Sequence, residues 1–81
     1  MSLIAQLQTE IAGRKYRLGE IAAGIRAKSD HIRSALSNPI AGPDDVKFSV
    51  IAEIASSIEK LQEEYATIRR EIRDLEKELR G

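Results

Sequence analysis

The sequence predicts an all-α fold, an antiparallel helical hairpin of two long helices with a coiled-coil seam, and we expect two copies to dimerise into a four-helix bundle. Three observations support this prediction. Apolar residues recur in alternating steps of three and four along both halves of the chain, both prolines lie between the halves, and the halves carry opposite net charge. The length of 81 residues allows one domain.

The first helix is expected at about residues 3–37. Its series of seam positions comprises Ile4, Leu7, Ile11, Arg14, Leu18, Ile21, Ile25, Lys28, Ile32 and Ala35. A helix places such a series on one face, and a series that persists over four or more heptads is typical of a coiled coil. Arg14 and Lys28 are charged, and we interpret them as seam residues that specify register or oligomeric state.

The turn is expected at about residues 38–43. Pro39 disfavours helical geometry in the residue before it, so the first helix should end near Ser37. Pro43 is tolerated in the first turn of a helix, where its missing N–H is not needed, and Gly42 is a candidate N-cap. The second helix should therefore begin near residue 43.

The second helix is expected at about residues 43–80. Its seam positions are all apolar, namely Ile51, Ile54, Ile58, Leu61, Tyr65, Ile68, Ile72, Leu75 and Leu79. Two helices of matched length joined by a short connection pack as antiparallel neighbours.

The charge pattern favours the same pairing. Residues 1–37 hold six basic and three acidic residues, a net charge of +3, whereas residues 44–81 hold seven basic and ten acidic residues, a net charge of −3. Folding about the turn should bring Arg17 near Glu64. It should also bring Lys15 near Arg69, an unfavourable neighbour. Exposed pairs contribute only about 0–1 kcal/mol each, so the seam supplies most of the stability.

The apolar stripe widens near the turn, and one partner helix cannot cover it. We therefore expect a symmetric homodimer, the commonest closed assembly, in which a second chain supplies two further helices. The candidate self-association residues are Leu36, Val46, Phe48, Val50, Ile51, Ile54 and Ala55.

The composition argues against catalysis and against bound groups. The chain has no cysteine and one histidine, and its acidic residues fall outside the seam, so we expect no enzyme, no metal site and no cofactor. No apolar run approaches the roughly 18 residues of a membrane span, and the N-terminus does not read as a signal peptide. We expect a cytoplasmic, non-catalytic module for protein–protein interaction or scaffolding, whose partners are itself and an unidentified protein.

An alternative function is binding of RNA or DNA by the basic face of the first helix. The candidate contacts are Arg14, Lys15, Arg17, Arg26 and Arg33. Equal numbers of basic and acidic residues, 13 of each, disfavour a dedicated polyanion binder, and only Tyr16 is interleaved for base stacking. The predicted architecture resembles the plasmid-encoded RNA-binding hairpin dimers and the WXG-type secreted hairpins. The chain shares no motif with the first and lacks the Trp-x-Gly turn of the second.

Overall fold

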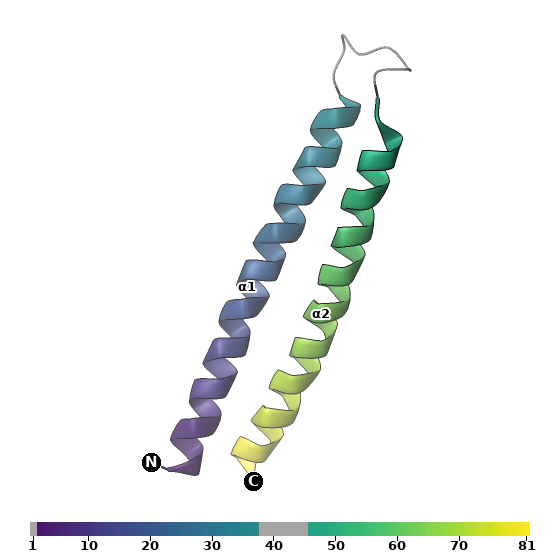
Figure 1. Ribbon diagram of the computed structural model, residues 1–81. Coiled ribbons are helices and arrows are strands. Elements are labelled where there is room, and N and C mark those ends of the chain that lie inside the picture. Colours follow the sequence, from purple (N-terminus) through teal and green to yellow (C-terminus); the bar gives the residue numbers. More distant parts are fainter. Residues whose placement is uncertain (1, 38–45) are drawn as a thin grey trace.

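The protein is a hairpin of two antiparallel helices, as the sequence predicts. A computed structural model describes residues 2–37 and 46–81, in which helix α1 spans Leu3–Leu36 and helix α2 spans Phe48–Arg80. The helices run side by side in opposite directions, and both chain ends lie at the same end of the rod (Figure 1). The molecule measures 61 × 16 × 15 Å.

The ends of α1 follow local capping chemistry. The hydroxyl of Ser2 accepts a hydrogen bond of 3.1 Å from the backbone N–H of Ala5, which satisfies one of the free donors of the first turn. At the other end, the N–H of Ser37 donates to the carbonyl of Arg33 at 3.0 Å, and the helix stops after Leu36. The predicted end near Ser37 therefore agrees with the structure.

The second helix begins later than predicted. Val46 and Lys47 lie outside α2, which starts at Phe48 rather than near residue 43, and Lys47 provides no side-chain cap. The predicted seam of this helix begins only at Ile51, and packing supplies most helical stability in proteins, so a start close to the seam is favoured. The predicted turn at 38–43, with Pro39, Gly42 and Pro43, lies outside the described residues.

The two predicted seams face each other and form the core. Its buried members are Leu7, Ile11, Ile21, Ile68 and Ile72. Further seam residues pack against this core while remaining partly exposed, namely Leu18, Ile25, Leu61, Tyr65, Leu75 and Leu79. The predicted neighbours Ile11 and Ile72 belong to the same cluster. The core of the hairpin is therefore built from one apolar stripe on each helix.

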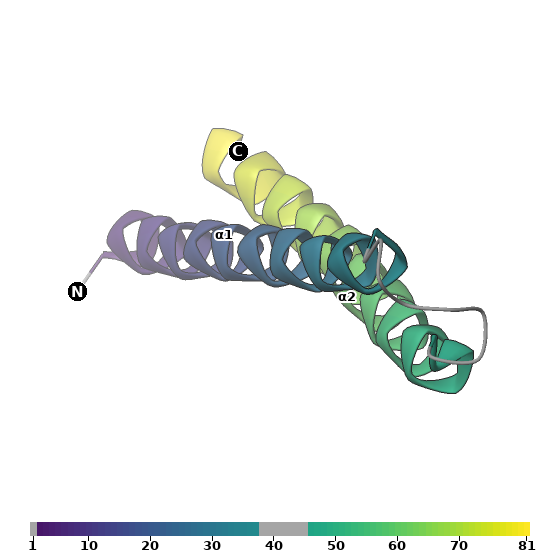
Figure 2. The ribbon, with the colours of Figure 1, turned by 90° about the horizontal axis from the view of Figure 1, so that it is seen from above.

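The core is uneven along the rod. The buried residues of the described chain lie at the middle of the hairpin and toward its free ends, and Ile21 is the most enclosed of them, at 1% exposure. Toward the turn, Ile32, Ile51 and Ile54 are only partly buried. Seen along the rod, the helices cross, and the two ends of α2 lie on opposite sides of α1 (Figure 2). The half of the hairpin near the turn is less well buried than the rest.

Candidate interaction surfaces

The predicted self-association residues form an incompletely buried apolar surface at the turn end of the rod. We call this surface the turn-end patch, and it comprises Leu36, Val46, Phe48, Val50, Ile51, Ile54 and Ala55. Phe48 is 63% exposed, Leu36 55% and Val50 43%. Ala55 is also exposed, while the other members are half-buried. Phe48 and Leu36 thus do not bury each other within one hairpin.

Other large exposed apolar side chains are more scattered. Leu3 and Ile4 lie at the free end, and Tyr16 lies alone on the outer side of α1. Single apolar residues on a surface are normal, whereas a contiguous set of them usually marks a contact site. The turn-end patch is the larger set.

The total exposed area is high for a chain of this mass. The protein exposes 6276 Å², while a compact monomer of 9.0 kDa would expose about 4,900 Å². The excess is therefore roughly 1,400 Å². This excess follows from the elongated shape, because a rod of two helices buries less of its own surface than a compact domain does.

The two charged seam residues differ in their surroundings. The guanidinium of Arg14 reaches the edge of the seam, where its Nε lies 3.7 Å from a carboxylate oxygen of Glu71 and its Nη1 lies 3.4 Å from the carbonyl of Glu10. Lys28 is half-buried and has no ion pair with any described residue. Arg14 is therefore paired with α2, and Lys28 has no such partner among the described residues.

The predicted contact between Arg17 and Glu64 is present and bidentate. Nε and Nη2 of Arg17 donate to the two carboxylate oxygens at 2.7 and 3.1 Å. This hydrogen bonding lowers the pKa of Glu64 below its ordinary value and raises that of Arg17. Glu20 adds a second, longer contact to Arg17 at 3.7 Å. The pair joins the two helices on one side of the seam.

The predicted nucleic-acid contacts do not form one surface. Arg14 and Arg17 are engaged by carboxylates of α2, and Arg33 pairs with Asp30 on its own helix at 3.2 Å. Only Lys15 and Arg26 of that set have no ion pair with a described residue. Residues two apart point about 200° apart on a helix, so Lys15 and Arg17 lie on opposite sides of the seam.

The hairpin consequently has two chemically different flanks. The paired flank holds the two ion pairs that join the helices, Arg14–Glu71 and Arg17–Glu64. The opposite side, which we call the basic flank, comprises Lys15, Ala22 and Arg26 of α1 with Gln62, Arg69, Arg73 and Glu76 of α2. The contribution of α2 to this flank was missed at the sequence level. The predicted proximity of Lys15 and Arg69 signalled it, and both residues line the same hollow.

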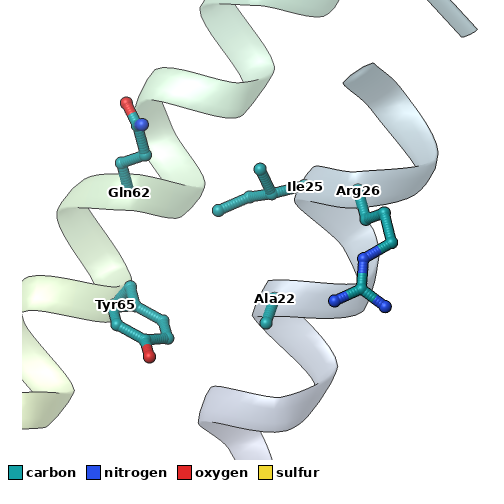
Figure 3. A pocket seen from close by; sticks show the side chains of 5 residues that line it. All are labelled: Ala22, Ile25, Arg26, Gln62 and Tyr65. Atoms are coloured by element: carbon teal, nitrogen blue, oxygen red, sulfur yellow. The ribbon is translucent and has the colours of Figure 1, made fainter. Parts of the chain in front are cut away.

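Two hollows lie along the basic flank. The first has a volume of about 400 Å³ and is lined by Ala22, Ile25, Arg26, Gln62 and Tyr65. Figure 3 shows Ala22 of α1 across from the ring of Tyr65 of α2, and the small methyl group leaves the space open. The second has a volume of about 220 Å³ and is lined by Lys15, Leu18, Arg69, Ile72, Arg73 and Glu76.

The described residues carry no other evident site. Neither α1 nor α2 has a stretch long and apolar enough to cross a membrane. Across residues 2–37 and 46–81, no three histidine, aspartate or glutamate side chains gather where they could hold a metal ion. Comparison of the chain with models of protein families, with curated proteins and with solved structures finds no match.

Proposed function

We propose that the protein is a non-catalytic interaction module that self-associates through the turn-end patch. The observation that carries this proposal is the exposure of Phe48, Leu36 and Val50 at the end of the rod where no described residue is fully buried. Apolar burial is the main driving force of protein association, and Leu36, Phe48 and Val50 are exposed apolar side chains near this end of the rod. A second copy covers this end and continues the coiled-coil seam into a four-helix arrangement.

Charge supports the turn end as the contact. A two-fold symmetric dimer brings the same surface of each copy together. Contact through the basic flank would bring Lys15, Arg69 and Arg73 against their own copies, which is unfavourable. The turn-end patch consists of apolar residues, and the exposed charges beside it are of both signs, Lys47 and Glu53. Two hairpins that overlap at their turn ends bury the turn-end patch of each copy and keep the two basic flanks apart.

The same features support a non-catalytic role in the cytoplasm. The chain offers one histidine, His31, which lies exposed on α1, and no cysteine. A cysteine-free small domain suits a reducing compartment, which is why the cytoplasm is the proposed location. Binding of RNA or DNA remains the alternative function. It has less support because Arg14, Arg17 and Arg33 are already paired with carboxylates.

Because the chain lacks cysteine, single introduced thiols provide a clean test of the contact. Ala55 lies in the turn-end patch and Ala12 lies in the other half of the rod, and both are exposed. With a short bis-maleimide reagent, Ala55→Cys should yield a covalent dimer and the matched control Ala12→Cys should not. Equal crosslinking of both variants, or preferential crosslinking of Ala12→Cys, would place the contact elsewhere and refute the proposal.

A further inference from the structure

The basic flank points to a second partner, and this inference rests on the proposed role as an interaction module. We propose that the two hollows of this flank, which we together call the groove, bind an acidic amphipathic helix of another protein. The groove lies between α1 and α2 in the middle of the rod and shares no residue with the turn-end patch. Both surfaces can therefore be occupied together.

The rims of the groove carry uncompensated positive charge. Lys15, Arg26, Arg69 and Arg73 have no ion pair with any described residue, and Glu76 is the one carboxylate that lines the hollows. Arg69 instead lies over the ring of Tyr65, at 6.0 Å from the ring centre. On the paired flank, by contrast, the hairpin neutralises its own arginines. Like charges held together on one flank favour a ligand that brings carboxylates.

The floor of the groove is apolar. Leu18 and Ile25 of α1 and Tyr65 and Ile72 of α2 line the two hollows. Of these, Ile72 is buried and the other three remain partly exposed, so they offer apolar contact to a ligand. An apolar floor between charged rims is the arrangement by which grooves bind one face of an amphipathic helix. A nucleic-acid backbone would use the rims and leave the floor uncovered.

The length of the groove fits three to four turns of a helix. From Lys15 to Arg26 the rim of α1 extends about 16 Å, and from Gln62 to Glu76 the rim of α2 extends about 21 Å, at 1.5 Å per residue. A helix of about 12–15 residues spans this distance. Such an occupant has apolar side chains at i, i+3 or i+4 and i+7, with Glu or Asp on both sides of that stripe.

A second copy of the hairpin does not suit this groove in a closed dimer. Two-fold symmetry would place the arginines of one basic flank against those of the other. Contact of a basic flank with the paired flank of another copy would be heterologous, and such contacts generate rings or open chains rather than dimers. The groove is therefore assigned to a different protein.

The test uses two synthetic helical peptides of about 15 residues with the same leucine stripe, one flanked by glutamates and the other by lysines. Binding to the full chain is followed by fluorescence anisotropy at low and high ionic strength. The glutamate peptide should bind, more weakly at high salt because exposed charges are screened, and the lysine peptide should not. A glutamate peptide of the same composition with a scrambled stripe should also fail, because it cannot cover the floor.

Matched variants locate the binding. Arg69→Glu with Arg73→Glu should weaken binding about tenfold or more, since it reverses two charges of the groove. The control, Arg70→Glu with Lys77→Glu, makes the same charge change outside the hollows and should have little effect. Ala22→Gln should obstruct the first hollow, whereas Ala23→Gln, on the outer side of α1, should not. Circular dichroism checks that each variant is folded.

Three results would overturn the inference. They are equal binding of the glutamate and lysine peptides, no binding of either at millimolar concentration, and binding of duplex DNA or single-stranded RNA that displaces the glutamate peptide. Self-association that is lost in the Arg69→Glu and Arg73→Glu variant would assign the groove to a second copy and also overturn it. The Ala55→Cys crosslinking result is independent of these measurements, so failure of the groove and failure of the turn-end dimer are distinguishable.

Discussion

Replacement of Phe48 by alanine separates self-association from folding of the hairpin. Phe48 is 63% exposed in the single chain, so most of its apolar surface is free to be buried by a second copy. For an aromatic residue of about 200 Å², this fraction corresponds to roughly 125 Å². At about 25 cal/mol per Å², burial of that area contributes about 3 kcal/mol in each copy. Since alanine retains part of the contact, a symmetric dimer should lose about 4 kcal/mol in total, roughly a thousandfold in its dissociation constant.

Two measurements follow this change. Sedimentation equilibrium gives the dimer constant, and thermal unfolding at several protein concentrations gives a melting temperature that depends on association. The matched control is Tyr16→Ala, which removes a 74% exposed aromatic side chain outside the turn-end patch. We expect Phe48→Ala to weaken the dimer and lower the melting temperature together, and Tyr16→Ala to leave the dimer unchanged. Equal effects of the two variants would refute the assignment of the contact to the turn end.

Four further predictions concern the hairpin itself. Ile72→Ala should lower the free energy of unfolding by about 2–5 kcal/mol in urea titration with less effect on the dimer constant, because Ile72 is buried in the core; a larger loss of dimerisation than in Phe48→Ala would contradict this. Glu64 has a pKa lowered from 4.5 by its guanidinium partner, so its pair stabilises the fold above that pH and loses the effect as pH falls through the depressed value. The melting temperature of Glu64→Gln should accordingly be lower than that of the wild type at neutral pH and equal to it in strong acid. A difference in melting temperature that persists in acid would argue against the ion pair as its cause. Lys28→Leu should raise the melting temperature and broaden the distribution of oligomers in sedimentation velocity, since a charged seam residue lowers stability but specifies one oligomeric state. A single species, unchanged from the wild type, would rule out that role. Pro39→Ala with Pro43→Ala should make a continuous helix of about 117 Å competitive with the 61 Å rod, and an unchanged particle in small-angle X-ray scattering would mean that the prolines do not enforce the hairpin.

The hairpin and its register could be predicted because they follow from periodicity. An unbroken series of three- and four-residue steps fixes which face of each helix is buried, and Ile11, Ile21, Ile68 and Ile72 occupy the core accordingly. The proximity of Arg17 and Glu64 followed from folding the chain about its turn, and the carboxylate is bound bidentately. The buried face of each helix and the pairing of the two helices therefore follow from helical geometry and the apolar stripe of each helix.

The basic flank could not be read from the first helix alone. Lys15 and Arg17 are close in sequence but lie on opposite sides of the seam, and only the second is neutralised by α2. The grouping of Lys15 with Arg69 and Arg73 depends on where the two helices meet, which composition does not determine. The start of α2 at Phe48 likewise depends on packing, because Pro43 and Gly42 would permit an earlier start.

The mass of the unmodified chain in solution tests the central claim most directly. Sedimentation equilibrium at micromolar concentration should give a reversible species of twice the 9.0 kDa chain mass, with dissociation on dilution. A two-fold dimer through the turn-end patch accounts for the exposed Phe48, Leu36 and Val50. A stable monomer of 9.0 kDa across the accessible concentration range would contradict the proposal that this end of the hairpin associates with a second copy.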